Sequence, residues 1–165
     1  MKFCCKMCVP RFEKNLTASI AKLDQKIIDS QLPFYPMTTC VVSGEDFGGA
    51  MGDPIDVVYN NRLVRLCCKM CKGDFKEDPK SFIAKLDTAV IAQQSEQYPL
   101  KSCPVSGEEL GSMGDAINVV YAGRLVKFCC SMCVPKFEAN QMATIEKIDA
   151  AWEASQTGLP GLGDN

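Results

Sequence analysis

The sequence contains no histidine and a single tryptophan among its 165 residues. Histidine is the side chain whose ordinary pKa suits acid-base chemistry near neutral pH, so the usual proton-transfer group is missing. The chain also shows no glycine-rich phosphate loop, and a Ser/His/Asp triad cannot be assembled from it. We therefore expect a protein that is not an enzyme.

The sequence also lacks an excess of charge and any long apolar run. It has 18 basic and 20 acidic residues and a pI near 5.2, so no positive surplus is available to hold a phosphate backbone, and nucleic acid is not an expected partner. No apolar stretch reaches the roughly 18 residues that a membrane span needs, and no hydrophobic signal core is seen at the N-terminus. As written, the chain is expected to be cytoplasmic and without a membrane span.

Cysteine, in contrast, is abundant, and every cysteine falls inside a repeated pattern. The runs are Phe3-Cys4-Cys5-Lys6-Met7-Cys8, Leu66-Cys67-Cys68-Lys69-Met70-Cys71 and Phe128-Cys129-Cys130-Ser131-Met132-Cys133, and the remaining cysteines are Cys40 and Cys103. The odd total of 11 cysteines and the adjacent Cys-Cys pairs argue against a fully paired disulfide framework, although a single disulfide bridge stays an alternative. Reduced, metal-binding thiols fit the pattern better.

The cysteine runs belong to a duplicated segment with a period of about 62 residues. The segments 35–71 and 98–133 share Val-Ser-Gly-Glu, Met-Gly-Asp, Val-Val-Tyr and Arg-Leu-Val in the same order. We divide the chain into a partial repeat at 1–34, complete repeats at 35–97 and 98–156, and a flexible tail at 157–165. Units of this size bury only about 60% of the surface of the unfolded chain, so a metal or docking between repeats would help to stabilise them.

The first copy lacks its front half, and Met1-Lys2-Phe3 aligns with Val126-Lys127-Phe128. One hypothesis is that Met1 is an internal or misassigned start, in which case the missing segment and a signal peptide for periplasmic export would lie upstream. The other is a genuine half repeat that packs on its neighbour. Such a half repeat can also complete itself against another chain, as a homodimer.

Each complete repeat has the pattern of an α+β module in which a β-hairpin is followed by helices. The β-rich runs 57–59 and 63–66 flank Asn60-Asn61, and 119–121 and 125–128 flank Ala122-Gly123. Helices are predicted at about 16–30 and 79–95 and around Ile145 and Ile148, from apolar residues at helical spacing. The segments 32–36 and 97–99 are predicted to be linkers, and the repeated Lys-Leu-Asp or Lys-Ile-Asp is predicted to be solvated surface around one buried aliphatic residue.

The position of the cysteine run, where the second strand ends and a helix begins, brings several thiols to one place. Thiolates of this kind are ligands for soft metal ions, and a helix start favours the ionised thiol. Each complete copy offers a loop cysteine and three more: Cys40, Cys67, Cys68 and Cys71, then Cys103, Cys129, Cys130 and Cys133. We favour the loop cysteine and the first and last of the run as ligands. The middle cysteine is a packing residue, a fourth ligand or a bridge to a second metal, and Cys4, Cys5 and Cys8 form an incomplete site.

A methionine precedes the last cysteine in every copy, at Met7, Met70 and Met132. Thioether sulfur beside thiolates suits Cu(I). The alternative, which we prefer, is that these methionines fill gaps in the core.

These motifs resemble the YHS and TRASH families of small heavy-metal-binding modules. The resemblance rests on Cys-Pro-Val-Ser-Gly, on a hairpin ending in Arg-Leu-Val-Lys-Phe-Cys, on the following Cys-x3-Cys with Phe137 four residues later, and on Asp78-Pro79 with Phe82. It implies a compact treble-clef-like hairpin and helix, whose cysteines bind copper, zinc or other metals in trafficking, resistance and sensing. Carried over by position, the implied ligands are Cys40, Cys67 and Cys71, then Cys103, Cys129 and Cys133.

The sequence therefore predicts non-enzymatic binding of Cu(I) or Zn(II), for trafficking, buffering or resistance, with metal ions and a protein that receives the metal as partners. An alternative is a structural-zinc module whose surface docks another protein. A thiol redox role for Cys68 and Cys71 is a third and weaker reading, because the thioredoxin-like βαβ context is missing.

Overall fold

The computed structural model describes residues 5–49 and 52–157. Contacts divide the chain into two compact units, Met1–Ile83 and Ala84–Asn165, and each is described by itself. The division falls inside a helix. The boundaries of the sequence repeats at 35 and 98 mark the duplication and stay a prediction.

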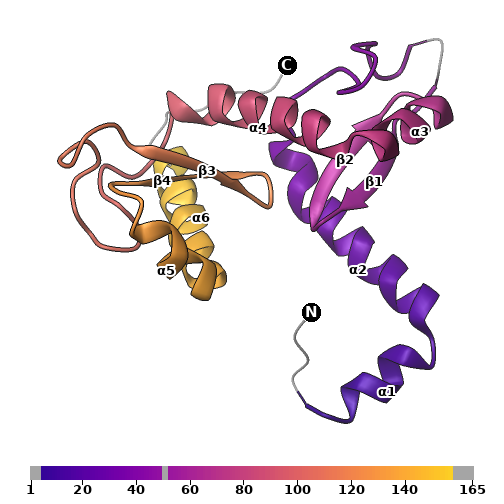
Figure 1. Ribbon diagram of the computed structural model, residues 1–165, viewed down its shortest axis with the longest axis horizontal. Coiled ribbons are helices and arrows are strands. Elements are labelled where there is room, and N and C mark those ends of the chain that lie inside the picture. Colours follow the sequence, from indigo (N-terminus) through magenta and orange to yellow (C-terminus); the bar gives the residue numbers. More distant parts are fainter. Residues whose placement is uncertain (1–4, 50–51, 158–165) are drawn as a thin grey trace. The chain divides into compact units, whose positions relative to one another are not determined.

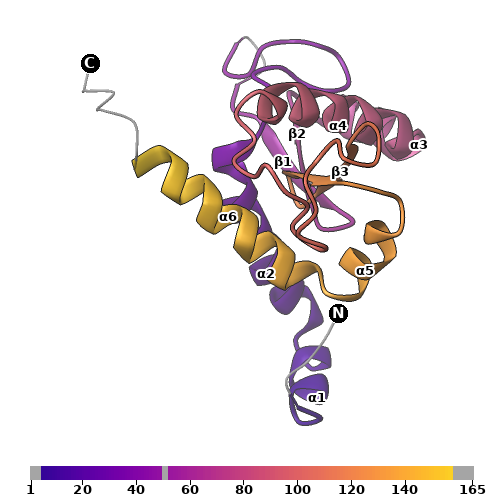
Figure 2. The same ribbon diagram turned by 90° about the vertical axis from the view of Figure 1, so that its left-hand side faces the viewer.

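Pairs of helices alternate with pairs of short strands along the chain (Figures 1 and 2). The first unit contains α1 (Cys8–Glu13), α2 (Leu16–Gln31), the 3-10 turn η1 (Leu32–Phe34), β1 (Ile55–Tyr59), β2 (Arg62–Leu66), α3 (Lys69–Glu77) and the start of α4 (Pro79–Ser95). The second contains the rest of α4, then β3 (Ile117–Tyr121), β4 (Arg124–Phe128), α5 (Cys133–Ala139) and α6 (Gln141–Thr157). The predicted α+β class, with a hairpin followed by helices in two copies, is confirmed.

Both predicted hairpins form, with antiparallel pairs such as Val57 with Val64 and Val119 with Val126. Their two-residue turns have positive φ at both central positions, 47° and 62° at Asn60 and Asn61. A tight two-residue turn needs this geometry to match the twist of the strands, and asparagine tolerates it well.

The predicted helices also form, and their bounds follow from local chemistry. The Asp78 carboxylate accepts a hydrogen bond of 3.2 Å from the backbone N–H of Ser81, and Pro79 is the first residue of α4. A capping carboxylate followed by proline is a common helix start. The residues after Thr157, predicted to be a flexible tail, lie outside the described residues.

The core of the second unit joins the hairpin to the helices that follow it. Phe128, Phe137 and Ile148 are buried together with the cysteines Cys103, Cys129 and Cys133. Tyr121 meets Phe137 edge to face with ring centroids 5.5 Å apart, and Tyr59 meets Phe75 in the same way in the first unit. The thiols therefore form one side of a packed apolar core.

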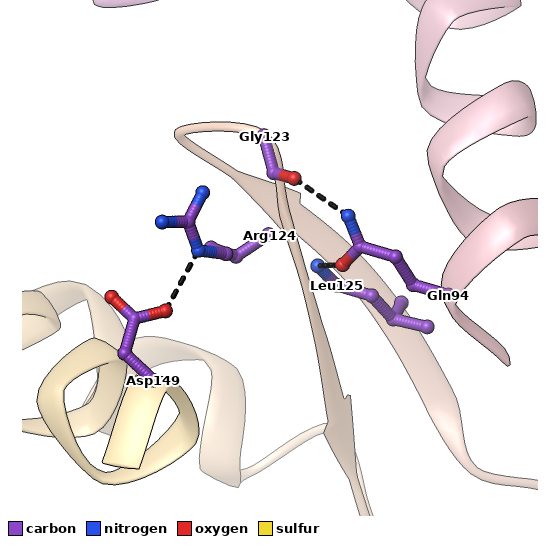
Figure 3. A network of polar contacts seen from close by, with 5 residues as sticks. All are labelled: Gln94, Gly123, Arg124, Leu125 and Asp149. Atoms are coloured by element: carbon purple, nitrogen blue, oxygen red, sulfur yellow. Dashed lines mark hydrogen bonds and ion pairs between the residues drawn. The ribbon is translucent and has the colours of Figure 1, made fainter. Parts of the chain in front are cut away.

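The helix that precedes each hairpin is bound to it through a glutamine in its last turn. The Gln94 amide nitrogen donates to the carbonyl of Gly123 at 2.9 Å, and its oxygen accepts from the N–H of Leu125 at 2.8 Å (Figure 3). Gln31 makes the same two contacts with Asn61 and Leu63. Each hairpin turn is thus held by a side chain from the preceding repeat.

Polar contacts involve residues of two segments that the sequence analysis discussed. The predicted linkers contain Tyr35 and Tyr98, whose hydroxyls accept hydrogen bonds from the N–H groups of Arg65 and Lys127. Asp149, predicted to be solvated surface, forms an ion pair of 2.7 Å with Arg124 (Figure 3). The neighbouring Ile148 is buried, as predicted.

Among the described residues, none of the helices has the length and apolar character needed to cross a membrane.

Candidate metal centre

Two clusters of three cysteine sulfurs are the chemical centres of the protein. Cys40, Cys67 and Cys71 form the first triad, and Cys103, Cys129 and Cys133 form the second; within each, the sulfurs lie within 4.8 Å of one another. All of these cysteines are buried. The structure brings together the loop cysteine and the first and last of each run, the three ligands that the sequence analysis favoured.

The loop cysteine sits in a closed turn. The Cys103 N–H donates to the carbonyl of Glu108 at 2.7 Å, and the Gly107 N–H donates back to the Cys103 carbonyl at 2.8 Å. Gly107 has a φ of 81°, in the left-handed region that glycine adopts without strain. The Cys40 loop repeats these contacts with Glu45 and Gly44. In the Cys103 loop, the backbone N–H groups of Ser106 and Val105 donate to the Cys103 sulfur.

The other two ligands come from the junction of strand and helix. Cys67 directly follows β2, and Cys71 lies in the first turn of α3, with 3.6 Å between the two sulfurs. Cys129 follows β4 and Cys133 begins α5, with a sulfur separation of 3.9 Å. The end of the strand and the start of the helix thus bring two sulfurs of each run close enough to be ligands of one ion.

A serine hydroxyl lies against each triad, a contact that the sequence analysis did not identify. Ser43 Oγ is 3.3 Å from Cys67 Sγ, and Ser106 Oγ is 3.2 Å from Cys129 Sγ. Each hydroxyl oxygen also accepts a bond from the backbone N–H two residues later and retains its own hydrogen as a donor. The repeated Val-Ser-Gly motif was the signal in the sequence that could have identified this contact.

The loop cysteines have the thiols that ionise most easily. Burial by itself raises the pKa of Cys103, but the Ser106 hydroxyl and the N–H groups of Ser106, Cys129 and Val105 lower it to about 6. Burial likewise opposes ionisation of Cys40, and N–H groups of Ser43 and Cys67 bring its pKa down to about 7. Without a metal, the Cys103 thiol is therefore mostly ionised at neutral pH, and the Cys40 thiol is about half ionised.

The last cysteine of each run behaves in the opposite way. Burial raises the pKa of Cys71 to about 12, and hydrogen bonds from Cys71 to Cys67 and Cys68 add to the effect. Cys133 is raised to about 12 as well, again chiefly by burial. Each metal-free cluster thus contains an easily ionised loop cysteine next to a last cysteine that keeps its proton. A metal ion that displaces this proton would bind sulfurs that are already close together.

The middle cysteine of each run lies at the rim of the cluster. Cys68 and Cys130 are half-buried, and their sulfurs lie 3.6 Å from Cys71 Sγ and 3.9 Å from Cys133 Sγ. Hydrogen bonds from the Cys71 backbone lower the pKa of Cys68, and from the Met132 backbone that of Cys130. Cys130 also packs against the core of the second unit, so the packing, ligand and bridging alternatives for the middle cysteine all stay predictions.

The first copy has no such cluster among the described residues. The sulfurs of Cys5 and Cys8 are 3.4 Å apart, with Cys5 exposed and Cys8 half-buried, and neither belongs to a triad. Cys4 lies outside the described residues.

The methionines before the last cysteine are on the surface. Met70 and Met132 are 73% and 66% exposed, and Met7 is 80% exposed. The prediction that they fill gaps in the core is wrong, because the α3 residues that face the core are Cys71 and Phe75.

A hollow of about 490 Å³ opens beside the loop of the second triad, lined in part by Cys103, Ser106 and Lys147. The Lys147 ammonium donates to the Pro104 carbonyl at 3.4 Å. A positive charge is thus held at the edge of the loop that carries the most acidic thiol.

Comparison of the chain with known protein families, curated proteins and solved structures finds no match. The resemblance to the YHS and TRASH families stays a prediction from the motifs. The geometry itself establishes two cysteine triads that are close enough to hold a metal ion.

Proposed function

We propose that each triad binds one soft metal ion, Cu(I) or Zn(II), and that the protein handles these ions without catalysing a reaction. The observation that carries the proposal is the pair of buried three-sulfur clusters. Thiolate ligands select soft ions, and the two ions named are those that all-sulfur sites commonly hold. Metal trafficking, buffering or resistance is the role we assign.

The partial exposure of the middle cysteine supports a role in transferring metal ions rather than a purely structural metal site. A carrier must pass its ion to another ligand, so one sulfur near the ion has to be reachable from solvent. Cys68 and Cys130 meet this need, because each is half-buried and within 4 Å of a buried triad sulfur. Hydrogen bonds to their sulfurs favour the thiolate, which is the form that exchanges metals.

A structural zinc site is the second candidate, supported by one set of distances. In the second copy the sulfurs of Cys129, Cys130 and Cys133 are mutually 3.9 to 4.0 Å apart. A tetrahedral zinc ion with bonds of about 2.3 Å separates its sulfur ligands by about 3.8 Å. With Cys103 as the fourth ligand, these sulfurs would close the coordination sphere.

Metal stoichiometry tests the proposal. Protein purified without oxygen should bind two equivalents of Cu(I) or Zn(II), one per triad. We expect one equivalent for Cys67→Ser or Cys129→Ser alone and none for the double variant, whereas Ser131→Ala, at an exposed position of the same run, should keep both. Absence of tight binding by the wild-type chain would refute both candidates.

The middle cysteines distinguish the two candidates. For the handling role, Cys68→Ser with Cys130→Ser should leave the stoichiometry at two and slow the transfer of Cu(I) to a competing chelator. For a closed zinc site, the same variant should lose zinc affinity by about tenfold or more, because a first-sphere ligand is gone. A stable disulfide between Cys68 and Cys71 under cytosolic redox conditions would instead favour the thiol redox reading.

A further inference from the structure

The second copy contains a fourth sulfur that forms another triangle with two sulfurs of the triad. Cys130 Sγ lies 3.9 Å from Cys133 Sγ and 4.0 Å from Cys129 Sγ. The sulfurs of Cys129 and Cys133 are themselves 3.9 Å apart. These three sulfurs therefore form a nearly equilateral triangle, and two of them also belong to the triad.

The loop cysteine and the middle cysteine lie at opposite ends of this arrangement. The cluster of sulfurs that are all within 4.8 Å of one another contains Cys103 but not Cys130. A tetrahedral ion with metal–sulfur bonds of about 2.3 Å keeps all of its sulfur ligands about 3.8 Å apart. A single ion would thus have to draw Cys103 and Cys130 together, whereas the four sulfurs as they stand present two three-sulfur faces with a common edge.

The size of the second triangle matches an ion with three ligands. An ion in the plane of three sulfurs, at bond lengths of about 2.3 Å, separates those sulfurs by about 4.0 Å. The observed separations are 3.9, 3.9 and 4.0 Å. Soft thiolates select Cu(I), which three sulfurs in a plane can hold, whereas structural Zn(II) sites have four ligands. The second triangle therefore suits Cu(I).

The middle cysteine of this copy is both held in place and reachable from solvent. Cys130 packs against the core that contains Cys129 and Cys133, so its sulfur is positioned before an ion arrives. Cys130 is also half-buried, whereas the three cysteines of the triad are buried. An ion can therefore reach the second triangle from the side of Cys130.

We propose that the second copy binds a second Cu(I) ion on the face formed by Cys129, Cys130 and Cys133. Cys129 and Cys133 then bridge this ion and the ion of the triad, so the proposal rests on the proposed function. The Cys130 thiol gives up its proton on binding, and the copper stays Cu(I). The second ion should bind about tenfold or more weakly than the first, because the two cations repel each other across shared ligands.

The corresponding face of the first copy has different dimensions. The sulfur of Cys71 lies 3.6 Å from those of both Cys67 and Cys68. These edges are shorter than the separation of about 4.0 Å that an ion in the plane of three sulfurs requires. We therefore assign the second ion to the second copy alone, and the first copy provides the matched control.

The number of bound copper ions tests the proposal. The wild-type chain is titrated with Cu(I) without oxygen against a competing chelator, and the ions on the monomer are counted by native mass spectrometry. We expect two equivalents at low free Cu(I) and a third at higher free Cu(I). Cys130→Ser should stop at two, whereas Cys68→Ser should still reach three. X-ray absorption of the three-copper form should show copper–copper scattering that the two-copper form lacks.

Three results would overturn the proposal and leave the proposed function standing. One is a wild-type chain that stops at two equivalents in excess Cu(I). Another is a third equivalent that Cys130→Ser retains, or one without copper–copper scattering, because the ion would then lie elsewhere. The last is a Cys130→Ser variant that keeps its circular dichroism but falls to one equivalent, which would make Cys130 a ligand of the triad's own ion. A wild-type chain that binds no Cu(I) or Zn(II) would refute the proposed function, and this proposal with it.

Discussion

The side chain of Gln94 is hydrogen-bonded to the backbone of Leu125, which lies 31 residues later in the chain (Figure 3). Its amide oxygen accepts a bond of 2.8 Å from the Leu125 N–H, and its amide nitrogen donates to the carbonyl of Gly123. Both contacts are buried. The last turn of α4 therefore fixes the turn between β3 and β4, and the second hairpin depends on a helix from the repeat before it.

Replacing this glutamine should destabilise the second unit. Gln94→Ala leaves a buried N–H and a buried carbonyl without their partner, which costs about 1–3 kcal/mol in the free energy of unfolding. Urea unfolding followed by circular dichroism measures the change. The neighbouring Gln93 is exposed, and Gln93→Ala should change the midpoint little; equal effects of the two changes would contradict the role of Gln94.

Much of the fold was predictable because its signals are local. The Asn60-Asn61 turn between β-rich runs indicated a hairpin, and the apolar spacing around Leu86 indicated a helix. The triads followed from the place of the cysteine run, since a strand end and a helix start bring residues four apart together. These features depend on short stretches of sequence.

The missed features depend on contacts between distant segments. Gln31 and Gln94 look like ordinary polar residues at helix ends, and nothing in their neighbours shows that each one binds a strand about 30 residues away. The exposure of Met70 depends on which side of α3 faces the core, whereas the usual role of methionine in filling core gaps suggested burial. The one available signal was repetition, because both glutamines occupy the same place in their copies.

The Ser106 hydroxyl should control ionisation of the second loop cysteine. This hydroxyl is the largest influence opposing the burial that raises the pKa of Cys103, and the net pKa is about 6. Ser106→Ala removes a donor to the thiolate, so the Cys103 pKa should rise, by about one, and its ionisation should move to higher pH. Carbon NMR of labelled cysteine in the reduced, metal-free protein gives the titration; an unchanged midpoint, equal to that of Ser131→Ala, would contradict the assignment.

The ion pair of Arg124 and Asp149 should contribute modestly to stability. Their side chains are 10% and 37% exposed, so solvent weakens the attraction, and Asp149→Ala should cost about 1 kcal/mol. A double-mutant cycle with Arg124→Met isolates the coupling energy between the two side chains. The coupling should fall in high salt, and a value of zero in low salt would show that the contact contributes nothing.

The exposed methionines should be dispensable for folding. Met70→Gln together with Met132→Gln should change the unfolding free energy by less than about 0.5 kcal/mol, because surface substitutions rarely do more. Phe137→Ala, at a position 2% exposed, should cost about 3–5 kcal/mol by leaving a cavity in the core. A large loss from the methionine changes would revive the packing role that their exposure argues against.

Removing the metal should lower stability by an amount that grows with the logarithm of its affinity. The triads join a loop, a strand end and a helix start, so an ion held by the folded chain alone stabilises it by about 4 kcal/mol at a thousand times its dissociation constant. Thermal unfolding without oxygen, with and without a strong chelator, measures this difference. The Cys67→Ser, Cys129→Ser double variant should unfold at the same temperature in both conditions, since no triad remains to bind the ion. If the chelator lowers the melting temperature of that variant as much as that of the wild type, the stabilising ion is bound somewhere other than the triads.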